Sequence, residues 1–237
     1  MSGTAATVKK YLDLNGIEYS GEQAEKLAAY TDALLEANKS FNLTSVKTVE
    51  EAALLHIADC AAAVRYLRAG TLADVGSGAG LPAFVIAIMR PDIFVTAIDA
   101  TGKKCDFIDG TARVLGLDNI FALCGRAEEL GRKAEMRGRF DTCTARAVAE
   151  LRILCELCLP LVKKGGLFAA MKGPKGDAEI SGAGRALELL GGRVTSADTF
   201  ELKGGAGLLR SVICIEKSGS TPPRYPRRFA VIKKNPL

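Results

Sequence analysis

Residues 72–82 read LADVGSGAGLP, a short apolar run followed by an aspartate, glycines at alternate positions and Leu-Pro. Glycine-rich turns that follow a strand commonly hold a nucleotide-like ligand, because glycine lets the backbone approach the ligand closely. The dinucleotide fingerprint G-x-G-x-x-G would need its third glycine at position 81, where this chain has Leu81. The spacing therefore predicts a nucleotide-like ligand and disfavours an NAD-dependent oxidoreductase.

The aspartate beside this loop narrows the choice of ligand. Asp74 ends the apolar run and precedes the glycines Gly76, Gly78 and Gly80. S-adenosylmethionine (SAM) carries an ammonium and a sulfonium, whereas the dinucleotides that similar loops hold carry a pyrophosphate. Since a carboxylate favours a positively charged neighbour, we expect SAM as the cofactor and S-adenosylhomocysteine as its product.

Acidic residues also follow the next two predicted strands. Asp99 could accept hydrogen bonds from ribose hydroxyls, or it could cap the following helix. Ala127 and Glu128 lie where an adenine would rest, although a glutamate in a first helical turn also complements the helix dipole. Because ligands of open α/β sheets bind at the carboxyl ends of the strands, these positions together with Asp74 favour a SAM site.

From residue 72 onward, strands alternate with helices. Strands are predicted at 72–75, 93–98, 120–124, 140–145 and 167–172, and helices near 81–89, 101–115, 127–137, 149–161 and 176–190. Apolar strands without strict polar alternation are typical of a parallel sheet covered on both faces. The last two strands, 193–202 and 208–217, are too close in sequence for a parallel crossover and must pair antiparallel. This α/β pattern resembles the Rossmann-like, seven-stranded fold of class I SAM-dependent methyltransferases, with its antiparallel last strand.

The first 68 residues are predicted to form a helical extension. A short helix stops at Gly16, and two further helical segments begin with residues spaced as capping boxes, Ser20 with Gln23 and Thr48 with Glu51. We therefore predict three parts of the chain. They are an N-terminal helical extension (1–68), a methyltransferase domain (69–217) and a basic C-terminal tail (218–237).

Composition excludes several classes of protein. The seven cysteines are scattered through predicted core segments and are interpreted as reduced, buried thiols. His56 is the only histidine, so a tetrahedral zinc site lacks ligands, no metal is expected, and most Ser-His-Asp and Cys-His schemes fail. No apolar stretch reaches the length of a membrane span, and the amino terminus has no secretory signal. We expect a cytoplasmic monomer that does not contact a membrane.

The segment after the fourth predicted strand bears on the methyl acceptor. Amino-group methyltransferases commonly place [DNS]-P-P-[FYW] there, whereas this chain has CTARAVAEL (143–151). Cys143 is a candidate nucleophile for C5-cytosine chemistry, but its mid-strand position favours core packing. No histidine or tyrosine is placed as a general base. Guanine N7 would need none, because it has an in-plane lone pair and no proton, and in-line transfer then depends on positioning the reactants.

Cations end the fourth and fifth predicted strands. Arg146 could contact the carboxylate of SAM, donate to guanine O6, or form a salt bridge with a nearby carboxylate. We expect it to position the reactants, by contact with the cofactor, the guanine or both. Lys172 offers a second cationic contact at the same rim, and we expect that contact to be with nucleic acid.

Positive charge is concentrated at the end of the chain. The net charge is +5, and the last six basic residues, from Lys217 onward, are accompanied by no acidic residue. Charge alone is equally compatible with a solvated terminus and with a polyanion contact. The candidate contacts are Arg224, Arg227, Arg228, Lys233 and Lys234.

Several segments, in order, resemble the RsmG (GidB) family of 16S rRNA guanine-N7 methyltransferases. They are FNLTSV (41–46), HIADC (56–60), DVGSGAGLP (74–82), AID (97–99), RAEEL (126–130), ARAVAEL (145–151), MKG (171–173) and the tail from 224 to 237. The resemblance implies methyl transfer from SAM to N7 of a guanosine at position 527, in the 530 loop of 16S rRNA in the small ribosomal subunit. It implies SAM contacts at Gly76, Leu81, Ala127, Glu128 and Arg146, and it favours RNA as the partner of the tail.

Two positions depart from the family pattern. Ala83 replaces a glycine that commonly follows Leu-Pro, and residues 230–232 replace a Gly-x-Pro, which leaves the path of the tail open. We expect removal of residues 218–237 to weaken RNA binding and to leave SAM binding almost intact. A non-catalytic RNA-binding or ribosome-assembly factor on a SAM-binding scaffold is the alternative function, which the intact loop, Asp99 and Arg146 disfavour.

Overall fold

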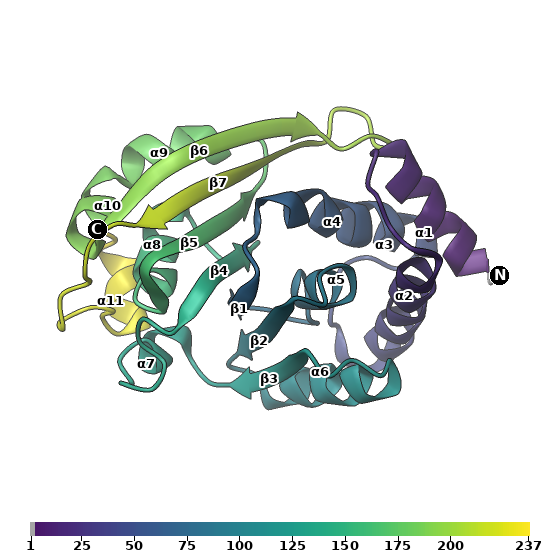
Figure 1. The fold of residues 1–237 in the computed structure, drawn as a ribbon, viewed down its shortest axis with the longest axis horizontal. Helices are drawn as coiled ribbons and strands as arrows, with labels where there is room; N and C mark the ends of the chain where they lie inside the picture. Colours follow the sequence, from purple (N-terminus) through teal and green to yellow (C-terminus); the bar gives the residue numbers. More distant parts are fainter. Residues whose placement is uncertain (1–2) are drawn as a thin grey trace.

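The computed structural model describes residues 3–237 and contains a seven-stranded sheet. Its strands are β1 (Gly70–Val75), β2 (Ile93–Asp99), β3 (Ile120–Cys124), β4 (Phe140–Arg146), β5 (Val162–Lys172), β6 (Gly192–Glu201) and β7 (Leu209–Lys217). They lie in the order β3-β2-β1-β4-β5-β7-β6 (Figure 1). The first five strands pair in parallel, and β7 pairs antiparallel with both β5 and β6. The predicted fold, including the antiparallel last strand, is confirmed.

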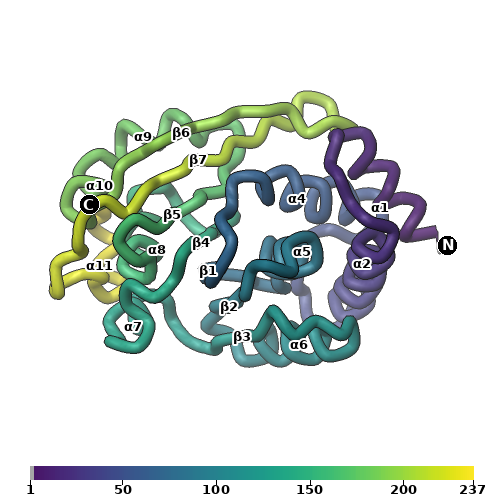
Figure 2. The backbone as a smooth tube through the Cα atoms, in the orientation of Figure 1, coloured from purple at the N-terminus to yellow at the C-terminus, as the bar shows by residue number. Residues whose placement is uncertain are grey.

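Helices cover both faces of this sheet (Figures 1 and 2). One face carries the N-terminal helices with α5 (Ala83–Met89) and α6 (Gly102–Val114), and the other carries α7 (Ala127–Leu130), α8 (Leu151–Cys158), α9 (Gly176–Gly182), α10 (Gly184–Leu190) and α11 (Phe229–Lys234). Each face has its own hydrophobic core: the first core lies under the N-terminal helices, α5 and α6, and the second core lies under α7 to α11. Leu72 of β1 belongs to the first core, and its neighbour Ala73 belongs to the second. Successive side chains of a strand point to opposite faces, so one apolar strand serves both cores.

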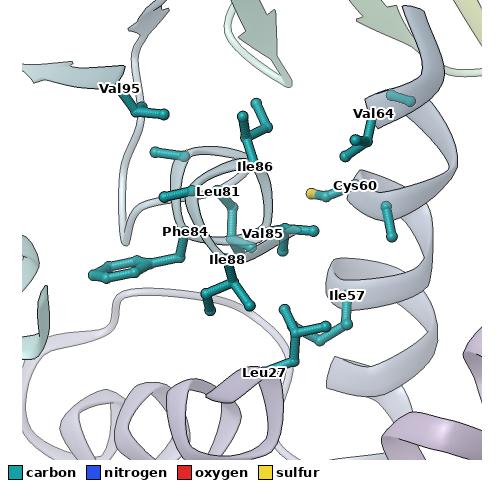
Figure 3. Packing of buried hydrophobic residues seen from close by; sticks show 14 of the residues in the cluster. Leu27, Ile57, Cys60, Val64, Leu81, Phe84, Val85, Ile86, Ile88 and Val95 are labelled. Carbon is teal, nitrogen blue, oxygen red and sulfur yellow. The ribbon is translucent and has the colours of Figure 1, made fainter. Parts of the chain in front are cut away.

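The N-terminal helices pack directly on the sheet's first core. They are α1 (Gly3–Leu14), α2 (Gly21–Phe41), α3 (Val49–Ala52), a π-helical segment (Ala53–Ala58) and α4 (Asp59–Ala63), followed by a 3-10 turn (Val64–Tyr66). Both predicted capping boxes, at Ser20 and Thr48, are confirmed. Figure 3 shows Leu27 of α2 and Ile57 beside the side chains of α5. The division into extension, domain and tail stays a prediction, because this core continues from the extension into the sheet.

Two predicted helices differ from the structure. The helix expected at 127–137 ends at Leu130, because the next residue is Gly131, a poor helix former. The chain then continues in turns, in which Arg137 Nη1 donates to Gly131 O at 2.9 Å. The helix expected at 176–190 is divided at Ala183 into α9 and α10. The fifth strand also begins at Val162 rather than at residue 167.

Candidate cofactor and acceptor site

The glycine loop has a backbone that only glycine adopts readily. Its three glycines have φ values of 73°, 61° and 89°, and positive φ is strained for residues with a Cβ. A Cβ on Gly76 would lie 2.5 Å from Val148, and one on Gly80 would lie 2.4 Å from the ring of Phe84. Gly76 N also donates to Ile98 O at 2.9 Å, at the end of β2. The loop is therefore fixed against β2, α5 and the segment after β4.

Asp99 joins the end of β2 to this loop. Its Oδ2 accepts a hydrogen bond from Gly78 N at 3.0 Å, and its Oδ1 accepts one from Thr101 N at 2.9 Å. Thr101, and not Asp99, occupies the N-cap position of α6. A carboxylate has about four acceptor sites, so Asp99 can order the loop and still accept from a ribose hydroxyl.

Asp74 is fully buried beneath the loop. Its Oδ1 accepts from Thr144 Oγ1 at 3.1 Å, whereas its Oδ2 has no hydrogen-bond partner within residues 3–237. Burial raises the pKa of Asp74 to about 6, although the Ser77 and Thr144 hydroxyls and the backbone N–H of Ala83 oppose the rise. A buried acceptor without a donor is unusual. Because Asp74 is fully buried, it supports the loop from behind and is not placed to contact a ligand directly.

A cavity of about 180 Å³ opens where β1, β2 and β3 end, and we name it the adenosine cavity. Its lining comprises Val75, Gly76, Ile98, Asp99, Ala100, Gly125, Arg126, Ala127, Glu128, Val148, Leu157 and Phe229. Largely apolar walls with a few polar groups are typical of cofactor sites. The buried carboxylates of Asp99 and Glu128 supply acceptors for a ribose, and the apolar side chains enclose a flat base, so the residues present fit an adenosine.

A second cavity, of about 410 Å³, lies at the ends of β4 and β5, and we name it the acceptor cavity. Its lining comprises Asp59, Arg146, Ala147, Met171, Lys172, Gly173, Pro174, Lys175, Glu179 and Arg210. Arg146 Nη2 donates to Asp59 Oδ2 at 3.2 Å, and Arg210 Nε donates to Asp59 Oδ1 at 3.0 Å. Lys172 Nζ lies 2.8 Å from Glu179 Oε2. The cavity thus has a cationic rim in which each acidic side chain is paired.

His56 completes the buried network behind Arg146. Its Nδ1 lies 3.3 Å from Arg146 Nη2, and its Nε2 lies 2.7 Å from Thr44 Oγ1. Burial, assisted by the charge of Arg146, lowers the pKa of His56 to about 4. The imidazole is therefore neutral at pH 7 and serves the packing of Arg146. It lies in the π-helical segment, an irregularity that often marks functional sites.

A strained turn separates the two cavities. Ala147 has a φ of 56°, a conformation that costs a residue with a Cβ about 1 kcal/mol or more. Ala147 lines the acceptor cavity, and the next residue, Val148, lines the adenosine cavity. The segment after β4 therefore passes between them, immediately after Arg146.

The structure brings together only some of the predicted cofactor residues. Gly76, Asp99, Ala127 and Glu128 line the adenosine cavity, and Arg146 lines the acceptor cavity. Asp74, Gly78, Gly80 and Leu81 line neither, and Leu81 is buried in the first core. These four residues shape the loop from behind. Cys143 is fully buried in the second core, as its mid-strand position favours.

The tail follows a defined path on the second face of the sheet. Glu156 is fully buried and accepts from Arg227 N at 2.7 Å and Arg227 Nη2 at 2.6 Å. Arg137 Nη1 donates to Tyr225 O at 2.8 Å, and buried Lys217 donates to Leu190 O. Arg227 and Lys172, two predicted RNA contacts, are thus bound to carboxylates of the protein. The exposed ones are Arg224, Arg228, Lys233 and Lys234.

Sequence reasoning assigned no role to Asp59, Arg210 or Phe229. Asp59 lies in the HIADC segment, so the family resemblance was the available signal for it. Arg210 is the second residue of β7, a strand interpreted only as part of a hairpin. Phe229 stands among basic residues of the tail, and a single aromatic residue in such a segment gives no signal of a ligand.

The remaining sequence predictions concern cysteines, metals and membranes. All seven cysteines are free thiols; six are buried, but Cys124 is exposed at the end of β3. Residues 3–237 contain no cluster of three His, Cys, Asp or Glu side chains that could hold a metal ion. Within the same residues, no helix has the length and apolarity that crossing a membrane requires.

The fold and the adenosine cavity together define a class I SAM-dependent methyltransferase. One similar solved structure is P. horikoshii TYW2 in complex with MeSAdo, with a TM-score of 0.53 and 14% identity over 69% of this chain and 63% of that chain. Another is M. jannaschii TYW2 in complex with AdoMet, with a TM-score of 0.52 and 13% identity over 68% of this chain and 74% of that chain. At this identity the likeness concerns the fold alone.

Sequence comparisons identify the family. The family described as GidB, rRNA small subunit methyltransferase G, matches residues 23–206. Relatives named ribosomal RNA small subunit methyltransferase G include one from Staphylococcus saprophyticus, 40% identical over 99% of this chain and 98% of the relative. Another, from Deinococcus radiodurans, is 42% identical over 90% of this chain and 85% of the relative. The chain belongs to the rRNA small subunit methyltransferase G family and is a SAM-dependent methyltransferase.

Proposed function

We propose that this protein, as a cytoplasmic monomer, transfers a methyl group from SAM to N7 of guanosine 527 in the 530 loop of 16S rRNA, in the small ribosomal subunit. The family resemblance supports the target. The chemistry of the acceptor cavity supports the choice of atom, because guanine N7 carries a lone pair and no proton.

This proposal is supported chiefly by the ion pairs of the acidic side chains around the acceptor cavity, because each of these carboxylates is already bound to a cation. Asp59 is paired with both Arg146 and Arg210. Glu179 is paired with Lys172 and also accepts from Leu151 N at 2.6 Å. A general base must be available to take a proton from the acceptor, and neither carboxylate is. An acceptor that loses no proton suits this cavity.

Positioning is then the main contribution of the protein. SAM, when bound, supplies an electrophilic methyl group on its sulfonium. Gly76 and Asp99 hold the cofactor end of the site, and the strained turn at Ala147 sets the boundary with the acceptor. Within residues 3–237 the protein contacts of Arg146 use Nη2, so Nε and Nη1 are available to the SAM carboxylate or to guanine O6. Alignment of two reactants can supply about 7–11 kcal/mol of a barrier.

The test uses small subunits from cells that lack the protein. Incubation with purified protein and SAM should produce N7-methylguanosine at position 527, detected by mass-spectrometric mapping and by borohydride–aniline cleavage of the RNA. Reconstituted RNA with 7-deazaguanosine at that position, which replaces N7 by C–H, should accept no methyl group. An unmodified natural loop, or methylation of the 7-deaza RNA, would overturn the proposal.

A further inference from the structure

We propose that Phe229 closes the adenine side of the adenosine cavity, so that the C-terminal tail forms part of the SAM site. Phe229 is half-buried and lines this cavity together with Asp99, Ala127 and Glu128. Asp99 ends β2, and Ala127 and Glu128 begin α7 shortly after β3, whereas Phe229 begins α11, about a hundred residues after Glu128. In Figure 1, α11 lies beside α7 and α8. Phe229 at the start of α11 is therefore on the same side of the sheet as Ala127 at the start of α7.

The position of Phe229 is fixed from both sides. Two residues before it, Arg227 is bound through its backbone N and its guanidinium to Glu156, which is fully buried. Three residues after it, Ile232 is fully buried in the second core. Leu157, which follows Glu156 in α8, lines the adenosine cavity as well. The ion pair therefore anchors the tail beside one cavity wall while Phe229 supplies another.

An aromatic ring at this place has a direct chemical use. Base–aromatic stacking tolerates any base because each has a π-face, and its loss on substitution by alanine is about 1–3 kcal/mol. The other side chains of the cavity offer aliphatic contacts and the acceptors of Asp99 and Glu128, and Phe229 is its only aromatic residue within residues 3–237. We assign adenine as its ligand, since the ribose acceptors lie in the same cavity.

The same ring also borders a basic groove. A cavity of about 600 Å³ that also includes Phe229 is lined by five cations and two glutamates, namely Arg126, Arg132, Arg227, Arg228, Lys233, Glu128 and Glu129. Arg126, Glu128 and Phe229 line both this groove and the adenosine cavity. The tail therefore contributes to the cofactor site and to a cationic surface at once. The proposal therefore differs from the sequence-based expectation that removal of the tail leaves SAM binding almost intact.

The test is calorimetric titration of the full chain with SAM and with 5′-methylthioadenosine, which lacks the amino-acid part of SAM. Phe229→Ala should weaken the binding of both ligands by the same factor, about 10-fold or more. Val231→Ala is the matched control, because Val231 is an exposed apolar residue of the same short helix and lines neither cavity. It should bind both ligands like the wild type.

Two further variants separate the effect of the aromatic ring from that of apolar volume. Phe229→Tyr retains the ring and should restore most of the affinity, whereas Phe229→Leu retains apolar volume without the ring and should not. Thermal unfolding without ligand separates a binding effect from a folding defect. Wild-type affinity of Phe229→Ala or Phe229→Leu for methylthioadenosine, or a loss confined to SAM, would overturn the assignment. None of these results depends on which RNA atom accepts the methyl group.

Discussion

Arg146, at the end of β4, donates to Asp59 of the N-terminal helical extension over 3.2 Å. The two residues are separated by 87 positions, and both side chains are largely buried, with exposed fractions of 17% and 6%. Asp59 also accepts from Arg210, so one carboxylate orients two cations of the acceptor cavity. The extension is thus connected to the acceptor cavity by this carboxylate.

Asp59→Asn should therefore reduce methyl transfer by at least about tenfold, because the two guanidinium groups would face each other without the charge that pairs them. Removing one partner of a buried ion pair costs about 3 kcal/mol or more of stability. The measurements are kcat/KM for the small subunit and the free energy of unfolding in urea. Asp92→Asn is the control: it breaks the exposed Arg90–Asp92 pair, which is worth less than about 1 kcal/mol. Equal rates for Asp59→Asn and the wild type would contradict this role.

The glycine loop gives a second, internally controlled prediction. Gly80→Ala places a Cβ 2.4 Å from Phe84 at a φ of 89°, and strain plus overpacking should lower the free energy of unfolding by about 3 kcal/mol. Gly78→Ala has a φ of 61° and its nearest neighbour at 3.9 Å, so only about 1 kcal/mol of backbone strain is expected. Urea denaturation of both variants checks the difference. Equal losses would show that packing against Phe84 is unimportant.

His56 should make stability depend on pH. Its pKa is lowered from 6.5 to about 4 in the folded protein, so the unfolded chain binds more protons between these values. The contribution of His56 to the free energy of unfolding is fully present above pH 6.5, and about 3 kcal/mol of it is lost as the pH falls to 4. Asp74, with a pKa raised from 3.8 to about 6, acts with the opposite sign in this range.

A comparison of two proteins isolates the histidine. His56→Gln retains Asp74, whose effect therefore cancels in the difference between the wild type and the variant. The stability advantage of the wild type over His56→Gln should shrink by about 3 kcal/mol between pH 7 and pH 4, measured by urea denaturation at each pH. A constant difference would show that His56 titrates alike in the folded and unfolded chains.

The sequence predicted those features of the structure that depend on residues close together along the chain. Capping boxes, the glycine loop and the short hairpin each involve residues a few positions apart, so their chemistry is visible in the sequence. Asp99 illustrates the limit of this reasoning. Its place at a strand end was predictable, but its hydrogen bond to Gly78 N across 21 positions required the fold.

The ion pair that anchors the tail could not be predicted from the sequence. Glu156 lies in the helical segment LRILCELC (151–158), where a lone glutamate is typical of a solvated face. It is instead fully buried and bound to Arg227, so Arg227, a predicted RNA contact, also anchors the tail. The pairing of two charges 71 residues apart depends on the packing of α8, which composition does not reveal.

The tail residues should accordingly divide into two groups. Arg228 and Lys233 are exposed beside the basic groove, so the double variant Arg228→Ala/Lys233→Ala should bind small-subunit RNA more weakly. Its affinity should also depend less on salt, by about 0.7–0.9 in the logarithmic slope for each lost phosphate contact. Its stability should change by less than about 0.5 kcal/mol.

Arg227→Ala should behave differently, because it leaves the buried carboxylate of Glu156 without its partner. We expect it to lower the free energy of unfolding by about 3 kcal/mol. Binding titrations over a range of KCl concentrations and urea denaturation of both variants distinguish the two groups. If the double variant keeps the wild-type salt slope, Arg228 and Lys233 are merely solvated. If Arg227→Ala is as stable as the wild type, the ion pair does not anchor the tail.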